Sequence, residues 1–452
     1  MKTRLSPLQL LAVGLMLLAM FLGAGNTIFA PMVGQEAGEN VWIPMSGFLV
    51  TGVGLVLLAI IALAMAGGRV ELLADRVHPA FSVVFCVLLF LTLGPIYVIP
   101  RTTSVVYEVS VLPNLDLSGT VAPWVLFGFS AAFITLTVIL SLNPSKFVDR
   151  LGKMITPVFS ILLLIIILRA LFSPLGEAGE ALEPYTEGAF LAGFTEGYFT
   201  MDVLAAFVFG AIFLHSVRAL GVTTREETTS VFIKAGIITV VGLSLLHIAL
   251  AWIGATSVDA IGYLDNGGAV LAESSRHLLG YAGLLMIGTV IFLTGLTTNI
   301  ACLSAVAEYF SRIFPAVSYK GWIYLLALLS LVITNFGLAT ILDMAIPILF
   351  LLYPMAITLI ALVLTNNLFG GHQAVYIGAM AGASIIAAAD AVKQTGLFTE
   401  RIDQALSFVP LFEGGGGWIL PALLGGIIGF VVAAARKESP RRYDLDGKVL
   451  QT

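Results

Sequence analysis

The sequence predicts an all-α polytopic membrane protein with about twelve transmembrane helices. Of its 452 residues, 59% are hydrophobic and only 11% are charged, whereas a soluble domain carries about 25% charged residues because its surface faces water. Apolar stretches of about 20 residues recur along the chain, and each is long enough to cross a hydrocarbon core of about 30 Å. The 46 glycines suit the close helix contacts that small residues allow in lipid.

The apolar stretches divide the chain into twelve expected spans. Their bounds are 8–35, 42–66, 80–109, 120–140, 147–172, 195–217, 229–256, 279–310, 319–335, 341–363, 372–389 and 417–436. If the N-terminus is cytoplasmic, most of the 22 Lys and Arg residues fall in cytoplasmic segments or at adjacent helix ends. Cytoplasmic loops are enriched in these residues, so we expect a multi-pass protein with both termini in the cytoplasm.

Several function classes are excluded by what the sequence lacks. The polar segments are too short for a soluble domain, and no GxxxxGK[ST] phosphate-binding loop occurs, which disfavours an ATP-driven pump. The five His residues are not spaced as metal ligands, so we expect no enzyme activity. Cys86 and Cys302 lie in apolar runs and are expected to pack rather than to form a disulfide. The expected partners are a small solute and the lipid bilayer, with no nucleic acid and no obligatory protein partner.

The first interruption of the apolar pattern lies inside span one, at Gly23, Ala24, Gly25 and Asn26. Glycine weakens a helix by up to about 1 kcal/mol relative to Ala, and an unwound segment at membrane depth is tolerated only where it lines a cavity or a protein interior. Freed amides would then suit a carboxylate. The alternative is a packing notch against a neighbouring helix.

The second interruption is in span six, where Thr200 and Asp202 occur inside an apolar run. An Asp costs about 2.5–3.5 kcal/mol at the centre of a membrane helix, so it should face protein or water and have a partner. It could instead lie near enough to the interface to stay hydrated. Phe199 and Val203, beside it, could contribute to a binding pocket or to helix packing.

Two further interruptions lie in spans three and eight. In span three, two Pro residues should kink the helix. Arg101 must either find an acidic partner, for which Asp343 and Asp202 are the candidates, or extend to the outer interface, about nine residues away. We expect an outer ion pair with Asp343 that closes the site. In span eight, Thr294, Thr297, Thr298 and Asn299 offer neutral oxygens of the kind hard cations prefer. The alternative is that the hydroxyls donate to carbonyls of their own helix.

The interruptions of spans one and six are five spans apart, so the two helices run in opposite directions. This placement predicts an inverted repeat of five plus five spans with discontinuous spans one and six, and a site between them. The expected division is 1–172 for the first repeat, 195–365 for the second, 372–436 for two accessory spans and 437–452 for a cytoplasmic tail.

At these interruptions the sequence resembles the bacterial branched-chain amino acid:cation symporters. The similarity is carried by FLGAGNTIF at 21–29, GPIYVIPRT at 94–102, TMDVLAA at 200–206 and LTT at 296–298, and it extends over essentially the whole chain. The family is similar to the amino acid–polyamine–cation superfamily with the LeuT-type fold. The resemblance implies import of Leu, Ile or Val across a bacterial inner membrane by symport with Na⁺. Coupling to H⁺, or transport of another small apolar amino acid, is the alternative.

The resemblance also implies roles for individual residues. The backbone from Gly23 to Asn26 would bind the substrate carboxylate, with Asn26 also reaching a sodium ion. Tyr97 falls near the position of a substrate-contacting tyrosine. A second sodium ion would be held by the carbonyls of Ala19, Leu22 and Thr294 and by the hydroxyls of Thr297 and Thr298. Asp202 departs from the sodium sites of that fold and leaves room for a protonatable step.

Overall fold

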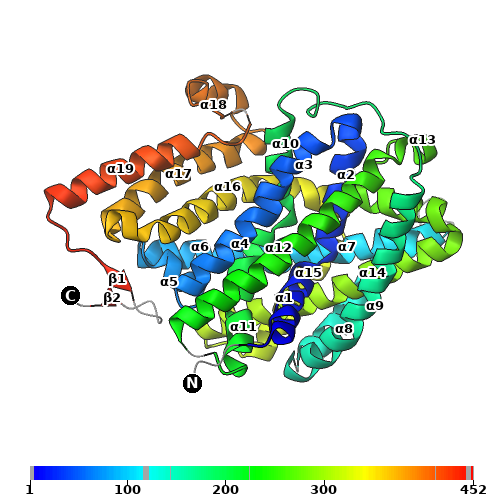
Figure 1. Cartoon of the computed structure of the whole chain (residues 1–452), viewed down its shortest axis with the longest axis horizontal. Helices are drawn as coiled ribbons and strands as arrows, with labels where there is room; N and C mark the ends of the chain where they lie inside the picture. Colours follow the sequence, from blue (N-terminus) through cyan, green and yellow to red (C-terminus); the bar gives the residue numbers. More distant parts are fainter. Residues whose placement is uncertain are drawn as a thin grey trace.

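The computed structural model of the protein describes residues 5–115, 122–142, 144–222, 224–412, 414–443 and 449–450. The chain is almost entirely helical (Figure 1). The α-helices are α1 (Pro7–Phe21), α2 (Ala24–Ala37), α3 (Trp42–Leu49), α4 (Leu55–Met65), α5 (Val70–Ala74), α6 (Pro79–Leu91), α7 (Val98–Val106), α8 (Ala122–Ser141), α9 (Pro144–Phe172), α10 (Ala189–Glu196), α11 (Asp202–Ala219), α12 (Arg225–Ala255), α13 (Val258–Ile261), α14 (Gly267–Ile313), α15 (Tyr319–Thr334), α16 (Leu338–Leu364), α17 (Gln373–Gln394), α18 (Thr399–Leu406) and α19 (Ile419–Ala435). Two short strands near the C-terminus, β1 (Arg442–Tyr443) and β2 (Val449–Leu450), pair antiparallel.

The helices account for the twelve predicted spans. Among the described residues, seven helical segments are long and apolar enough to cross a membrane, and two bent helix pairs raise the number to nine. Three shorter apolar helices, at 157–172, 319–334 and 419–435, lie where the remaining spans are expected. The prediction of an all-α polytopic membrane protein is confirmed, while the division into two repeats stays a prediction.

Several spans are not single regular helices. A π-helical turn, Val50–Gly54, joins α3 to α4, and another, Thr92–Ile96, separates α6 from α7. The kink predicted for span three is therefore present. Span eight begins earlier than expected, because α14 starts at Gly267. This helix changes direction at Gly280, whose φ of 63° lies in the left-handed region. The short helices α5, α13 and α18 were not predicted.

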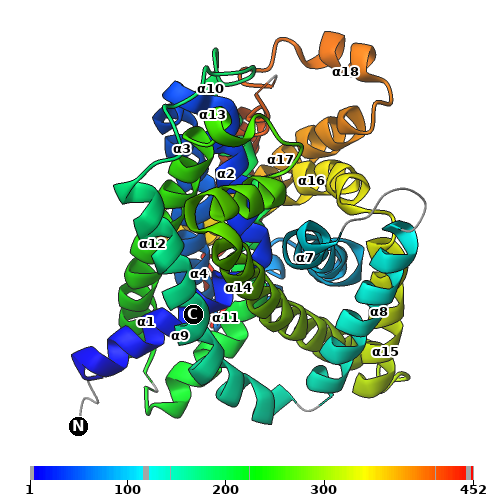
Figure 2. The same cartoon turned by 90° about the vertical axis from the view of Figure 1, so that its right-hand side faces the viewer.

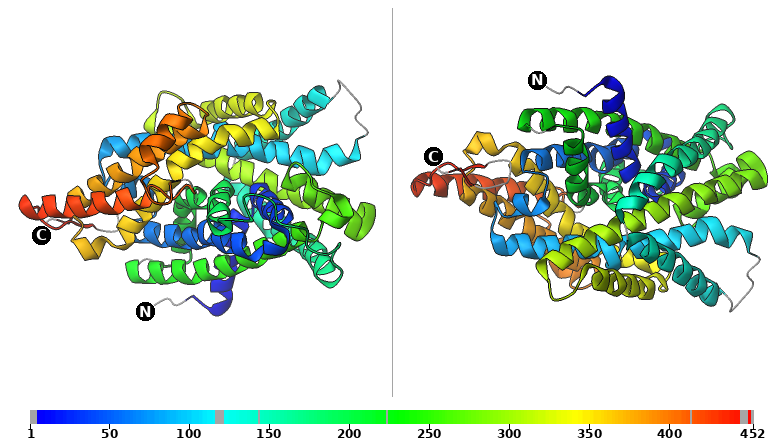
Figure 3. Two further views of the ribbon diagram at one scale, coloured as in Figure 1. Left: turned by 90° about the horizontal axis from the view of Figure 1, so that it is seen from above. Right: turned by 90° about the horizontal axis from the view of Figure 1, so that it is seen from below.

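The termini lie on one side of the molecule, together with α5, and α10, α13 and α18 lie on the opposite side (Figures 1 and 2). The last two spans, α17 and α19, pack against each other at one end of the molecule, where α17 also contacts α16 (Figure 3). The central helix α12 packs along α1, α2 and α4. The broken first span is thus held against a continuous helix on both sides of its break.

Close packing of α2 against α12 depends on glycine. A Cβ atom at Gly34 would lie 1.9 Å from the carbonyl oxygen of Ala251, and one at Gly254 would lie 1.9 Å from that of Pro31. Backbones can approach this closely only where side chains are absent. The small residues therefore fix the position of α2 relative to α12.

The outer helices expose large apolar side chains. Trp124 on α8, Leu328 on α15 and Ile428 on α19 are 76%, 60% and 63% exposed. Extended apolar surface of this kind is unfavourable in water, and it matches a protein that is surrounded by lipid.

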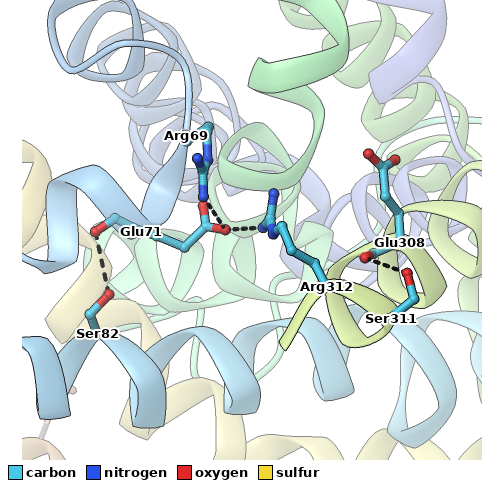
Figure 4. Close-up of polar contacts among 6 residues, drawn as sticks. All are labelled: Arg69, Glu71, Ser82, Glu308, Ser311 and Arg312. Carbon is cyan, nitrogen blue, oxygen red and sulfur yellow. Dashed lines mark hydrogen bonds and ion pairs between the residues drawn. The ribbon is translucent and has the colours of Figure 1, made fainter. Parts of the chain in front are cut away.

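A charged cluster joins α5 to the end of α14. The side chain of Glu71 accepts hydrogen bonds from Arg69, at 3.3 Å, and from Arg312, and its backbone carbonyl accepts one from the hydroxyl of Ser82 (Figure 4). Both arginines are about half exposed. Exposed ion pairs typically contribute about 0–1 kcal/mol, so this cluster orients the helix ends more than it stabilises them.

Candidate functional site

The first span breaks where the glycines predict it. Helix α1 ends at Phe21, α2 begins at Ala24, and the two halves meet at 73°. Gly23 has extended backbone, with φ −96° and ψ 164°. A Cβ atom at Gly23 would lie 2.9 Å from the hydroxyl oxygen of Thr298, and one at Gly25 would lie 2.1 Å from Nη2 of Arg101. Glycine is therefore required at the break because side chains of other spans approach the backbone there.

The side chain of Asn26 spans this break. Its Nδ2 donates to the carbonyl of Phe21 at 2.6 Å, which also accepts from the backbone N–H of Gly23 at 2.7 Å. The same Nδ2 donates to Oδ2 of Asp202 at 2.7 Å. One buried amide thus connects the break in span one to the break in span six.

The sixth span breaks at Met201. A short 3₁₀ turn, Gly197–Thr200, follows α10, and Met201 then takes a left-handed conformation with φ 62° before α11 starts at Asp202. The carboxylate of Asp202 therefore lies at a helix N-terminus, where the helix dipole favours negative charge. Its backbone N–H donates to the hydroxyl of Thr200 at 3.4 Å. Asp202 is only 3% exposed, so it does not stay hydrated at the membrane interface.

Arg101 points from α7 into the protein interior. Its Nη1 donates to the carbonyl of Phe199 at 2.6 Å and to the hydroxyl of Tyr97 at 3.3 Å. The guanidinium carbon lies 4.7 Å from the ring centre of Tyr97 and 5.4 Å from that of Phe29. These contacts hold a cation beside the break of span one.

The polar stretch of span eight divides into two parts. The Thr294 hydroxyl donates to the carbonyl of Val290, at 2.8 Å, and that of Thr297 to the carbonyl of Thr294, at 2.9 Å. These two hydroxyls thus donate to carbonyls of their own helix, which was the alternative to cation binding for this stretch. Their oxygens nevertheless keep lone pairs. Thr298, by contrast, lies next to Gly23 and forms no hydrogen bond with the part of the chain that the structure describes.

Residues of spans one, three, six and eight line a common cavity. Its polar lining comes from the four predicted interruptions: Gly23, Gly25, Asn26, Arg101, Thr200, Asp202 and Thr298. Its apolar lining is Met20, Phe21, Leu93, Val98, Met201, Ala205, Phe209 and Cys302. The site combines a guanidinium and a carboxyl group with an apolar wall.

Some predicted site residues lie outside this lining. Ala24 and Val203 are fully buried in packing, and Tyr97 reaches the site only through its hydrogen bond to Arg101. Phe199 contributes its carbonyl to Arg101, and its ring lies 5.7 Å from that of Phe29. Ala19 is partly exposed on α1, and Leu22 is buried at the break.

The ion pair predicted between Arg101 and Asp343 is not formed. Asp343 is exposed near the start of α16, whereas Arg101 is 3% exposed. Within the described ranges, Arg101 has no ion pair with any acid. The prediction was wrong because the break between Gly94 and Tyr97 turns α7 so that Arg101 faces inward.

The sequence analysis did not predict the apolar residues that line the cavity. Leu93, Val98, Ala205 and Phe209 look like any other apolar residues of their spans, and Cys302 was assigned to packing alone. The available signal was their spacing: all lie within about two turns of an interruption. Residues one or two turns from a polar break are candidates for a pocket.

Similarity to solved structures defines the fold. The chain aligns with the transporter Mhp1 in its inward-facing conformation with a TM-score of 0.63, covering 94% of this chain and 91% of that one at 15% identity. The transporter MhsT gives a TM-score of 0.55 over 94% and 98% of the two chains, at 16% identity. The fold is therefore the LeuT-type transporter fold, as predicted.

Sequence comparison identifies the family. The model of the branched-chain amino acid transport protein family matches residues 6–436. The permease BraB of Bacillus subtilis is 42% identical over 96% of this chain and 97% of its own length, and BrnQ of the same organism is 39% identical over 97% and 100%. The BrnQ permease of Escherichia coli is 33% identical over 94% and 95%. The chain belongs to this family, and it is a transporter rather than an enzyme.

Proposed function

We propose that this protein imports branched-chain amino acids by secondary active symport with Na⁺. The proposal rests on the cavity between the two broken helices, which places Asp202, Arg101 and the span-one break against an apolar wall. The names of the related permeases support the same substrate class. A zwitterion with an aliphatic side chain has the matching chemistry, because its charged groups need polar partners and its side chain needs an apolar surface.

Sodium coupling is supported by the position of Thr298. Its hydroxyl oxygen lies beside Gly23, in the break of span one. The predicted set of Ala19, Leu22, Thr294, Thr297 and Thr298 offers neutral oxygens, which suit a monovalent hard cation better than a divalent one. Sodium bound there would connect span one to span eight and favour one conformation, provided that its affinity differs between conformations.

Proton coupling is the second candidate, and one observation favours it. Asp202 is a buried acid in the cavity itself, hydrogen-bonded to Asn26. Intramembrane acids of this kind commonly form proton relays. A proton on Asp202 would remove the charge that faces the substrate, and so would couple protonation to binding.

The proposed orientation places both termini in the cytoplasm of a bacterial cell, in its inner membrane. The support is the distribution of Lys and Arg, together with the observation that the start of α1 and the strands β1 and β2 lie on the same side of the molecule as α5 (Figure 1). Cysteine labelling of intact cells, with one cysteine at the C-terminal tail and one in the segment after α9, tests it. Labelling of the tail from outside contradicts the orientation.

Counterflow tests the substrate class without depending on the coupling ion. Proteoliposomes containing the purified protein are loaded with unlabelled leucine, diluted into a trace of labelled leucine, and assayed with and without competitors. We expect Ile and Val to compete and Asp and Lys not to. An apolar pocket separates Leu from Val by only about 1–3 kcal/mol, so all three should be carried. Absence of leucine exchange contradicts the proposal.

A further inference from the structure

Arg101 is a buried cation without an anionic partner. It is 3% exposed on α7, inside span three, and no acid of the described ranges forms an ion pair with it. A buried charge is costly unless it is paired and hydrogen-bonded. The two aromatic rings beside it supply only part of the compensation. A ligand that brings negative charge would supply the rest.

The hydrogen bonds of the guanidinium show which edge is available. Nη1 uses its protons on the carbonyl of Phe199 and the hydroxyl of Tyr97. Nε is buried without a hydrogen-bond partner, and Nη2 also donates to none of the residues that the structure describes. Nε–H and one N–H of Nη2 point the same way, and this parallel pair is the fork that binds a carboxylate through both oxygens.

The guanidinium of Arg101 lies against the break of span one. Nη2 lies so close to Gly25 that a Cβ atom there would approach it to 2.1 Å, and Nε would be 3.2 Å from the same atom. Both Gly25 and Arg101 line the cavity. A carboxylate bound to the fork would therefore also lie near the backbone of the broken helix.

Asp202 places a carboxyl group in the same cavity. Its Oδ2 accepts from Asn26, and its Oδ1 accepts no hydrogen bond from any described residue. Arg101 and Asp202 are not within the 4.0 Å of an ion pair. A guanidinium and a carboxyl group that share a cavity without contacting each other are complementary to a ligand that carries a carboxylate and an ammonium group.

We propose that Arg101 binds the carboxylate of the substrate through Nε and Nη2, while Asp202 binds its ammonium group. The transporter would then recognise zwitterionic α-amino acids by a pair of side chains, and the apolar wall would select the aliphatic side chain. This inference rests on the proposed function and assigns Arg101 to substrate binding rather than to an outer gate.

Ligands that lack one charged group test the pair. Dissociation constants of leucine, leucinamide and 4-methylpentanoate are measured on the purified protein by competition with labelled leucine. Leucinamide has no carboxylate, and 4-methylpentanoate has no ammonium group. Because hydrogen bonds to charged groups contribute about 1.5–3 kcal/mol each, the two bonds of the fork predict that the wild type prefers leucine to leucinamide by about 100-fold or more. A wild type that binds the two equally overturns the proposal.

The variant Arg101→Gln makes the assignment specific. It should weaken leucine binding by about 100-fold or more and leave leucinamide binding within about threefold, so that the preference for leucine disappears. Arg101→Lys, which keeps the charge and loses the fork, should give an intermediate preference. Equal weakening of both ligands, or an unchanged preference, means that Arg101 has a structural role only.

A matched control is Arg76→Gln. Arg76 is also buried, at 5% exposure, but it contacts Tyr376 and lies outside the cavity lining. Its substitution should leave the preference for leucine over leucinamide unchanged. If the wild type binds no leucine at all, the proposed function fails, which is a different result from loss of the preference.

Discussion

Replacing Gly25 by Ala should weaken substrate binding without unfolding the protein. The added Cβ would lie 2.1 Å from Nη2 of Arg101, and ordinary contact begins at 3.4 Å, so the guanidinium must retreat by about 1.3 Å. The guanidinium cannot move that far and keep its 2.6 Å hydrogen bond to the carbonyl of Phe199 unless the backbone at Phe199 moves with it. A charge-assisted hydrogen bond contributes about 1.5–3 kcal/mol, which corresponds to about 10- to 150-fold in affinity.

The assay is equilibrium binding of labelled leucine to the purified variant, with its melting temperature measured in parallel. Gly25→Leu, which fills the cavity further, should abolish uptake while the protein still inserts into the membrane. Gly128→Ala is the control, because a Cβ atom at Gly128 meets nothing within 4 Å, and it should bind leucine as the wild type does. Wild-type affinity in Gly25→Ala would falsify the placement of the site at this break.

Three further substitutions test other parts of the account. Asp202→Asn keeps the size of the side chain and removes its charge, so leucine affinity should fall by about 10- to 150-fold; unchanged transport and an unchanged pH profile would make the residue structural. Thr298→Ala should raise the Na⁺ concentration for half-maximal uptake by at least about tenfold, since even outer-shell changes cost 10- to 100-fold in metal affinity, and leucine binding at saturating Na⁺ should change much less. An equal response to Na⁺ in Thr298→Ala and wild type argues against that ligand. Gly254→Ala places a Cβ atom 1.9 Å from the carbonyl oxygen of Pro31, and overpacking of this kind costs about 1–3 kcal/mol; the melting temperature should fall while the folded fraction keeps its leucine affinity, and a melting temperature equal to that of the wild type contradicts the packing argument.

The break of span one could be predicted because its cause is local. Gly23 and Gly25 weaken the helix wherever they occur, and Asn26 is too polar for a lipid-facing position. The structure adds what the local sequence does not contain, namely that Thr298 and Arg101 approach those two glycines from distant spans. The sequence therefore identifies the break, and tertiary packing explains why it must be glycine.

The break of span six was predicted from Asp202, but its geometry was not. The helix is interrupted by the left-handed conformation of Met201, and methionine gives no signal for that conformation, which Gly and Asn adopt more readily. The polar residues beside it, Thr200 and Asp202, indicated the right place for a different reason. They are tolerated there because they line a cavity.

The orientation of Arg101 could not be predicted from span three alone. Counting residues placed it within reach of the outer interface, where a long side chain can extend to water. The π-helical turn and the non-helical backbone at Gly94 rotate α7 instead, and the guanidinium is held by a carbonyl 98 positions away in the chain. A contact of that sequence separation leaves no local pattern.

The central claim is that the cavity carries a branched-chain amino acid together with an ion. Uptake of labelled leucine into proteoliposomes, with an inward Na⁺ gradient at equal pH and a pH gradient without Na⁺ imposed separately, tests it most directly. We predict accumulation above equilibrium with the Na⁺ gradient and none when choline replaces Na⁺. Accumulation that follows the pH gradient and ignores Na⁺ contradicts sodium coupling and makes Asp202 the coupling site. Leucine that only equilibrates under both gradients contradicts secondary active transport.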